Sequence, residues 1–408
     1  MRLFRQICFQ VHWFIGITAG IILAVVGVTG ALLSFEDSII DALNRDVRTV
    51  TPRAEGPLQP AELLARISAA HPEKRITALT VSSEPNRAAR VTFAPERSAQ
   101  GSGRGGRGES RYVDPYTGEL IAGAGNRGEG FFRATMQIHR WLMVGSFGDR
   151  DIGRQIVGAS TLLLTVLALT GLYLRWPSRR VLDWRAWLAL NFKQRGRLFI
   201  WNLHAVAGTW VLLFYLVMSL TGLYWSYEWY RNGLYALAGV ERPARFGPPG
   251  PPAGGQDSSF EPVDVSRAWM AFMRETTDTG FGSATLTLPG KPGDPVEIRY
   301  LDVRPRHERA FNTLVADPAT GDVLRHERYA EKPPGARFMA SIFPLHSGSF
   351  FGLPGTIVFM IASLAMPLFT VTGWMLYLSR RRRKKAALAE RRQAEAAALA
   401  TGQAGSTG

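Results

Sequence analysis

The sequence predicts a membrane α-helical protein with four transmembrane helices in two pseudo-symmetric repeats, and with two small α+β domains outside the membrane. Three observations predict this class: four long apolar stretches, an internal repeat that includes two of them, and strand-like alternation in the segments between. A helix needs roughly 20 residues to cross a hydrocarbon core of about 30 Å. Four nearly uncharged stretches meet that length: 13–35, 156–176, 203–227 and 356–378.

Basic residues beside these stretches predict the orientation of the chain. The formal net charge of the 408 residues is +15, and much of it lies at 1–12, in the connection 177–202 and in the tail 379–408, which we expect to be disordered. Positive segments stay in the cytoplasm, so both termini are predicted there, in a bacterial inner membrane. This concentration of charge also removes the main argument for nucleic-acid binding. We expect the first stretch to remain as an anchor, because it is too long for a signal core.

The two predicted outer segments, 36–155 and 228–355, share one order of elements. Each begins with an amphipathic helix, at 60–68 and 263–274, and continues with alternating strands. The expected strands are 76–81 and 90–93 in the first segment, and 284–288 and 296–300 in the second. Each segment then contains an Asp-Pro-x-Thr-Gly sequence, beginning at Asp114 and Asp317. Proline and glycine in this spacing predict a hairpin turn.

The duplication continues into the apolar stretches. Aligning His12 with His204 brings Thr29-Gly30 onto Thr221-Gly222 without a gap. The other two stretches share Thr170-Gly171 and Thr372-Gly373, and His139 and His346 precede them at similar distances. These matches predict two copies of a helix, outer domain and helix, related by a pseudo-twofold axis along the membrane normal.

Histidine placement suggests a cofactor. His12 and His204 are predicted at the cytoplasmic ends of helices one and three, and His139 and His346 at the outer face before helices two and four. Paired imidazoles without a nearby acid, cysteine or third histidine suit axial coordination of haem better than zinc. We therefore predict two b-type haems, while Cys8, the single cysteine, excludes covalent Cys-x-x-Cys-His attachment. The small residues Gly16, Gly20, Gly208 and Gly222 would allow a flat macrocycle or a helix to approach.

The alternative for each histidine is an interfacial side chain bonded to backbone or lipid. The same choice applies to Arg140, which either pairs with a haem propionate or anchors the helix at the interface. Catalytic residues and substrate-binding residues are not identified, because the sequence has no Gly-x-Ser-x-Gly, His-Glu-x-x-His or Walker motif.

Several of these runs resemble the PepSY-associated transmembrane helix family, also described as iron-regulated inner-membrane proteins. The runs are His139-Arg-Trp-Leu-Met-Val-Gly, Ile156-Val-Gly-Ala-Ser, Thr170-Gly-Leu-Tyr-Leu-Arg-Trp-Pro and the two Asp-Pro-x-Thr-Gly turns. The resemblance implies PepSY-like periplasmic domains and two haems held by His12, His204, His139 and His346. It also implies a ferric-siderophore reductase, whose electron donor is an unidentified cytoplasmic protein, a quinone or a diffusible reductant.

Three hypotheses follow. The first is a di-haem electron conduit that reduces ferric siderophores or related chelates to release Fe(II). The second is a membrane-anchored PepSY module that binds or regulates a partner without a redox cofactor. The third, an iron or solute transporter, is disfavoured because acidic residues and broken helices at mid-membrane are not expected from the sequence.

Overall fold

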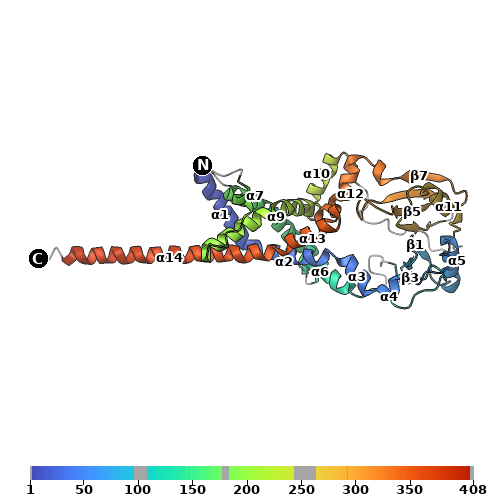
Figure 1. Ribbon diagram of the computed structural model, residues 1–408, viewed down its shortest axis with the longest axis horizontal. Coiled ribbons are helices and arrows are strands. Elements are labelled where there is room, and N and C mark those ends of the chain that lie inside the picture. Colours follow the sequence, from blue (N-terminus) through green and yellow to red (C-terminus); the bar gives the residue numbers. More distant parts are fainter. Residues whose placement is uncertain are drawn as a thin grey trace.

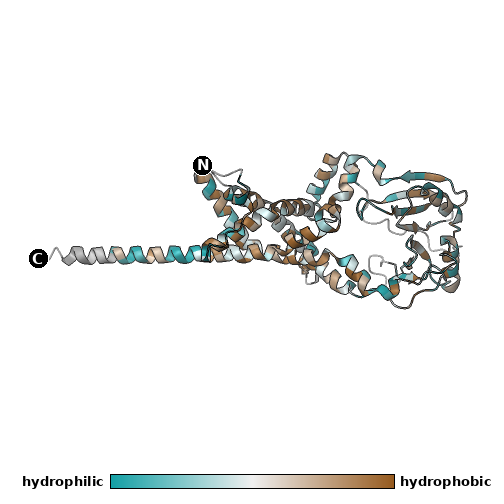
Figure 2. Ribbon diagram, viewed as in Figure 1, coloured by the Kyte–Doolittle hydropathy of each residue, from teal (hydrophilic) through white to brown (hydrophobic). Residues whose placement is uncertain are grey.

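The chain forms an elongated molecule with a helical bundle in its middle and a β-sheet at one end (Figure 1). This computed structural model describes residues 2–95, 108–146, 148–176, 183–242, 263–291 and 293–404. Both termini lie on the side of the bundle away from the sheet. Hydrophobic residues dominate the bundle, whereas hydrophilic residues are frequent in the sheet region and in the C-terminal helix (Figure 2). The two outer segments therefore lie together, opposite the termini.

Within the described part of the chain, three helices are long and apolar enough to cross a membrane, or four if a bent pair counts as one span. The three are α7 (Arg150–Arg175), α9 (Gly196–Ser226) and the helix formed by α13 (Gly352–Leu364) and α14 (Met366–Ala404). The bent pair is α1 (Arg2–Thr18) and α2 (Gly20–Leu33). These helices contain the apolar residues of the four stretches that the sequence predicts.

The first span bends by 61° between α1 and α2. At the bend, Thr370 Oγ1 on α14 donates a hydrogen bond to the Gly20 carbonyl (2.8 Å), and Thr18 Oγ1 donates to the Phe14 carbonyl (2.9 Å). Polar side chains that bond to helix carbonyls are a recognised cause of such bends. The corresponding helix α9 is unbroken over 31 residues. The two repeats therefore differ in shape at this point.

Two further helices, which the sequence did not predict, hold the outer histidines. They are α6 (Glu129–Trp141) and α12 (Pro334–Ser347). α6 packs on α2 and α7, while α12 packs on α9 and on α10 (Glu228–Ala238). Each ends at a left-handed residue, Leu142 (φ 51°) and Gly348 (φ 83°), which turns the chain toward the next span. Three shorter helices are α3 (Glu36–Leu43), α4 (Arg45–Arg48) and α8 (Trp184–Leu188).

The described strands form one antiparallel sheet in the order β3-β2-β1-β4-β5-β6-β7. Their bounds are β1 Ile76–Ser82, β2 Ala89–Phe93, β3 Ser110–Val113, β4 Ser283–Thr287, β5 Val296–Leu301, β6 Asn312–Ala316 and β7 Val323–Glu327. The four strands that the sequence predicts are confirmed as β1, β2, β4 and β5. The central strands β1 and β4 come from different outer segments, with Leu79 opposite Leu286.

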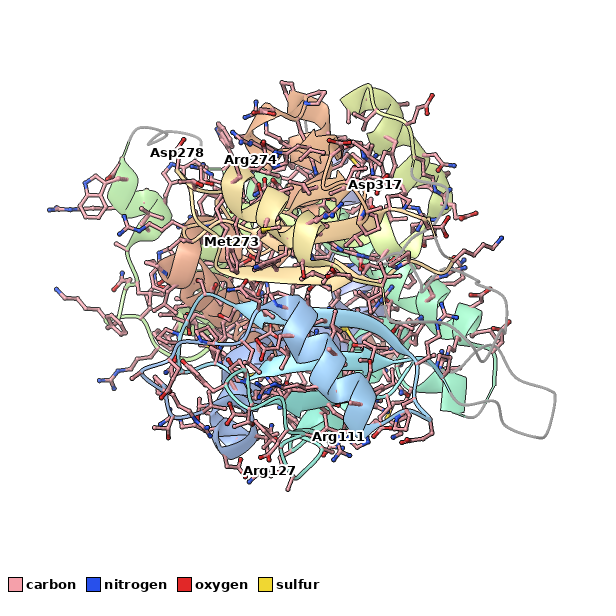
Figure 3. The ribbon with its side chains drawn as sticks, turned by 90° about the vertical axis from the view of Figure 1, so that its right-hand side faces the viewer. Arg111, Arg127, Met273, Arg274, Asp278 and Asp317 are labelled. Atoms are coloured by element: carbon pink, nitrogen blue, oxygen red, sulfur yellow. The ribbon has the colours of Figure 1, made fainter. Side chains whose placement is uncertain are left out.

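The expectation of two separate outer domains is therefore corrected, because the two segments share one sheet and one core. Helices α5 (Pro60–Ala70) and α11 (Ser266–Glu275) cover the same face of the sheet, the face that Figure 3 views. Beneath them, one cluster of buried side chains includes Ile67 from α5 and Phe272 from α11. Pairing β1 with β4 removes two edge strands that separate domains would expose. The other face of the sheet lies toward the bundle (Figure 1).

Both Asp-Pro-x-Thr-Gly sequences form the predicted tight turns. Asp114 Oδ1 accepts the Tyr116 N–H at 2.8 Å, and Asp317 Oδ1 accepts the Ala319 N–H at 2.7 Å. The glycine that closes each turn has a positive φ, 82° at position 118 and 79° at position 321. The repeated sequence therefore makes the same turn in both halves of the sheet.

The expected disorder of the tail is wrong for the described residues, because α14 continues as a helix to Ala404. Ala, Leu, Glu, Gln, Lys and Arg, which make up most of residues 380–400, all have high helix propensity. The helix extends well beyond the bundle, as Figure 1 shows. High polarity alone is therefore a poor sign of disorder here. The predicted cytoplasmic connection falls partly at 177–182, outside the described residues.

Candidate cofactor site

The four candidate ligands lie in two pairs within the bundle. The ring centroids of His12 on α1 and His204 on α9 are 6.3 Å apart. The ring centroids of His139 on α6 and His346 on α12 are also 6.3 Å apart. These are the pairs that the predicted topology and repeat bring together, one toward the termini and one toward the sheet.

Each imidazole rests against a Thr-Gly pair on a neighbouring helix. His12 Nδ1 lies 2.9 Å from Thr170 Oγ1, and the Cβ that a side chain at Gly171 would add lies 3.2 Å from His12 Cε1. Glycine thus leaves the space that the ring fills. The other sets are His139 with Thr29-Gly30, His204 with Thr372-Gly373 and His346 with Thr221-Gly222, at Nδ1–Oγ1 distances of 3.3, 2.7 and 3.0 Å.

Hydrogen bonding of the threonines determines which ring nitrogen carries the proton. Each threonine hydroxyl is positioned to donate to the carbonyl four residues earlier, at Val25, Val166, Val217 and Leu368 (2.6–2.8 Å). A hydroxyl oxygen whose proton is used in this way accepts the Nδ1–H of the histidine. The carbonyls of Val26 and Met218 also lie 3.0 and 3.1 Å from Nδ1 of His139 and His346. Nδ1 is therefore the protonated nitrogen, and Nε2 carries the lone pair.

The separation within each pair suits a metal between two imidazoles. Imidazole nitrogen binds a metal at about 2.0 Å, so two opposed ligands place their ring centroids about 6 Å apart. The observed 6.3 Å agrees with this spacing. Among the described residues, there is no cluster of three or more His, Cys, Asp or Glu side chains able to hold a metal. Two protein ligands per metal, with the remaining positions supplied by a macrocycle, fit this donor set.

We call His12 and His204, which lie toward the termini, the inner pair, and His139 and His346, which lie toward the sheet, the outer pair. A large cavity opens at the inner pair. It has a volume of about 1410 Å³, lies between α1, α7, α9 and α14, and reaches His12 and His204. Ligand pockets for drug-sized molecules span about 300–1,000 Å³, so a macrocycle has room here. Gly16 and Gly208 line the cavity, and a Cβ at Gly16 would meet nothing within 4 Å. Gly222 has a different role, because it lies beside His346.

The mouth of this cavity is positively charged. Among the described residues, its lining contains no Asp or Glu, and its cations are Arg5, Arg175, Arg197, Arg380, Arg381 and Lys384. Two of them already bond to backbone: Arg5 donates to the Leu174 carbonyl (3.2 Å) and Arg175 to the Ala186 carbonyl. A ring with acidic substituents, such as the propionates of haem, would place its charges favourably here. The donor set and the cavity thus fit haem b.

An apolar cluster separates the two pairs. It includes Leu23, Leu164 and Met366, all buried. Phe369 contacts the ring of His204 (5.3 Å between centroids) and that of Tyr215 (5.7 Å). The Tyr215 hydroxyl donates to the Ala362 carbonyl at 2.9 Å, so its polar end is satisfied. Leu23, Leu164 and Met366 also line the cavity, so this part of its wall is apolar.

The remaining candidates lie apart from the pairs. The Arg140 guanidinium stacks 4.6 Å from the centroid of the Trp141 ring, and its role toward a propionate stays a prediction. His326, which is mostly buried, bonds Glu275 (3.2 Å) and the Tyr300 hydroxyl (2.8 Å), and His71 lies 3.7 Å from Glu73. The four threonines were missed as functional residues, although their recurrence beside glycine in the repeat was the available signal.

A family model described as the PepSY-associated TM region matches residues 9–380. The match includes all four histidines, all four Thr-Gly pairs and both turns, and it ends within α14. No curated protein matches the chain significantly.

Proposed function

Because the chain belongs to the PepSY-associated transmembrane family, we propose that it is a di-haem electron conduit of the bacterial inner membrane. It reduces ferric siderophores, or related ferric chelates, in the periplasm and so releases Fe(II) for iron uptake. The activity is that of a ferric-siderophore reductase, in which the ferric ion gains one electron. The electron comes from a cytoplasmic protein or a membrane quinone.

One observation carries this proposal: the imidazoles of each pair lie 6.3 Å apart between ring centroids, and Nδ1 of every ring lies within 3.3 Å of a threonine hydroxyl. The other ring nitrogen of each imidazole, Nε2, then keeps its lone pair and can act as a metal ligand. No described residue donates a hydrogen bond to any of these four nitrogens. A haem iron held by each pair would take these nitrogens as its protein ligands.

The protein's own residues have separate roles in this proposal. His12 and His204 hold one haem, and His139 and His346 hold the other, so each repeat supplies one ligand to each haem. Bound haem supplies a reversible one-electron change of its iron. The threonines fix the tautomer and orientation of the imidazoles. The arginines at the cavity mouth bind the propionates of the inner haem.

The arrangement of charge supports the orientation. Arg5, Arg380 and Lys384 line the cavity, both termini lie on the side of the bundle away from the sheet (Figure 1), and basic clusters near the ends of membrane spans are typical of the cytoplasmic side. The sheet then lies in the periplasm, where it meets the substrate.

The test is a visible spectrum of the purified protein, oxidised and dithionite-reduced, with haem quantified per chain. We expect low-spin b-type bands and about two haems. His204→Ala should lose one haem and His346→Ala the other, with ferric-chelate reduction abolished in both. His71→Ala, which changes a histidine outside the pairs, is the matched control and should keep both haems.

Retention of two haems by all four single variants of His12, His139, His204 and His346 would contradict the proposal. A protein that remains colourless when purified from haem-replete cells would favour the alternative function, a membrane-anchored PepSY module that binds or regulates a partner.

A further inference from the structure

A second, smaller pocket lies between the sheet and α12. Its volume is about 320 Å³, and its wall includes β5 and β6 on one side and Ala340 of α12 on the other. On β5, Val296, Ile298 and Tyr300 are buried in the core, so Glu297 and Arg299 lie on the opposite face. The pocket is thus on the face of the sheet that lies toward the bundle (Figure 1).

Three cations converge on this pocket. Arg299 comes from β5, Arg309 from the loop before β6, and Lys332 from the segment before α12. Of the described residues in the lining, Glu297 is the one carboxylate. Arg299 and Lys332 are partly buried. Burial, followed by the charge of Arg309, lowers the pKa of Arg299, and burial likewise lowers the pKa of Lys332.

None of the three cations pairs with a carboxylate among the described residues. The Arg299 guanidinium lies 3.7 Å from the centroid of the Phe311 ring, and Lys332 Nζ donates to the Phe311 carbonyl at 3.2 Å. Arg309 lies over the Phe343 ring at 4.8 Å. These contacts orient the side chains without neutralising them. Like charges held together in a partly buried pocket are stabilised by an anion.

The pocket is connected to the outer histidine pair by aromatic contacts. Phe343 on α12 packs against Trp225 on α9 (6.4 Å between centroids), and Trp225 packs against His346 (5.3 Å). Ala340, Phe343 and His346 recur every three residues along α12, which keeps them near one another on the helix. A molecule bound beside Arg309 is therefore separated from His346 by two aromatic side chains.

We propose that the pocket formed by Arg299, Arg309 and Lys332 binds the anionic oxygens of a ferric chelate. This inference rests on the proposed function, and it specifies the substrate class: ferric complexes of carboxylate or catecholate ligands with net negative charge, in preference to neutral or cationic hydroxamate complexes. Guanidinium groups bind carboxylate oxygens through paired hydrogen bonds, and the ammonium group of Lys332 adds a point charge.

Gallium(III) citrate tests binding without reduction, because Ga(III) is not reduced under these conditions. We expect the purified haem-loaded protein to bind it, with intrinsic tryptophan fluorescence or calorimetry as the readout, and to bind a cationic gallium hydroxamate at least about 10-fold more weakly. Arg299→Gln and Lys332→Gln should each weaken citrate binding by about 10-fold or more, which is the scale of one lost charge-assisted hydrogen bond. Binding should also weaken with added salt.

Two control variants sharpen the test. Glu297→Gln removes the lining carboxylate and should tighten binding several-fold. Arg325→Gln removes an arginine of β7 that already pairs with Glu327 (3.1 Å), and it should leave binding unchanged. An unchanged haem spectrum in each variant shows that the protein is folded.

The inference is overturned if Arg299→Gln and Lys332→Gln bind citrate as tightly as Arg325→Gln, or if the hydroxamate binds as tightly as citrate. The proposed function fails separately, when haem is absent from the native protein. If a haem-free protein binds gallium citrate and Arg299→Gln does not, the result would support the anion pocket but not the proposed haem function.

Discussion

His204 Nδ1 lies 2.7 Å from Thr372 Oγ1, and Thr372 in turn lies 2.7 Å from the Leu368 carbonyl that accepts its hydroxyl proton. This short chain leaves the lone pair of His204 on Nε2. The same arrangement occurs at His12, His139 and His346, so it is a property of the repeat. The four sites differ, however, in how many oxygen acceptors lie near Nδ1. Loss of the threonine hydroxyl should therefore affect some sites more than others.

If the proposed haems are bound, Thr372→Val should weaken binding of the one held by His12 and His204. It removes the Oγ1 acceptor of His204, and loss of such an outer-shell partner typically reduces metal affinity about 10- to 100-fold. Thr221→Val should have a smaller effect on the outer site, because the Met218 carbonyl still lies 3.1 Å from His346 Nδ1. Haem content after dilution into apomyoglobin, a haem acceptor, measures both effects.

Two further variants control this comparison. Thr372→Ser retains an oxygen acceptor and should restore haem retention. Thr18→Val removes a hydroxyl that bonds only helix carbonyls, and it should retain both haems. Equal loss of haem from Thr18→Val and Thr372→Val would show that the effect is general destabilisation of the bundle.

Replacing the glycines beside the histidines with alanine should lower haem occupancy to different degrees. A Cβ at Gly30 would lie 3.1 Å from His139 Cε1, closer than most Cβ contacts, whereas a Cβ at Gly373 would lie 3.9 Å from His204 Cε1. Gly30→Ala should therefore displace the ring and lower occupancy of the outer haem. Gly373→Ala should leave the inner haem in place. Haem per chain and the reduced spectrum distinguish the two, and equal occupancy in both variants would contradict the packing argument.

The shared sheet predicts a specific cross-link. Thr80 on β1 and Thr285 on β4 are directly opposite, and their hydroxyls lie 2.9 Å apart. Cysteines at both positions should form a disulfide when the purified protein is oxidised, because directly opposed strand residues have the required Cβ separation. Mass spectrometry of non-reduced peptides detects the bond.

The matched control pairs Thr80→Cys with Thr287→Cys, two residues out of register, since Thr287 is opposite Ala78. This pair should cross-link poorly. Efficient cross-linking of the control and none in the opposed pair would contradict the register of β1 and β4.

Much of this architecture was predictable because its signals are local. Length and hydropathy locate the spans, and alternation locates β1, β2, β4 and β5. Aligning His12 with His204 in the internal repeat also predicts which histidines lie together, because the topology allows one pair toward each end of the bundle. The tight turns at Asp114 and Asp317 are equally local, because proline and glycine impose them directly.

What the sequence could not predict depends on partners distant in the chain. The pairing of β1 with β4 joins segments about 200 residues apart. Alternation of apolar and polar residues indicates which face of a strand is buried, but it does not indicate which strand lies next to it. The bend at Ala19 depends on Thr370 reaching Gly20 from α14. Helices α6 and α12 are short and amphipathic, so hydropathy windows suited to spans pass over them. The basic pocket brings together Arg299, Arg309 and Lys332 from three separate segments.

His307 predicts the pH dependence of the junction between the sheet and α12. Its Nε2 lies 2.9 Å from the Tyr329 hydroxyl and 3.1 Å from Ser341 Oγ on α12, and its Nδ1 accepts the Arg309 N–H at 3.1 Å. Burial lowers the pKa of the His307 imidazole. Protonating Nδ1 would also break its bond to the Arg309 N–H.

The sign of the effect follows from this lowered pKa. Between the unfolded pKa of about 6.5 and the lower folded pKa, the unfolded chain binds a proton that the folded protein does not. Stability is therefore fully present above about pH 6.5, declines as the pH falls toward the folded pKa, and levels off below it. The Tm of the full protein, followed by intrinsic fluorescence from pH 7.5 to pH 5, should fall by a few degrees, since about 1 kcal/mol shifts Tm by roughly 2–4 °C in larger proteins.

His307→Gln should be less stable than the native protein at pH 7.5 but should lose less stability on acidification, because glutamine does not titrate. His71→Gln, which changes a histidine elsewhere in the outer part, should keep the native pH slope. A native slope in His307→Gln would assign the pH dependence to another group. Because His307 also bonds the backbone of Arg309, binding of gallium citrate should weaken in His307→Gln as well, which connects this junction to the basic pocket.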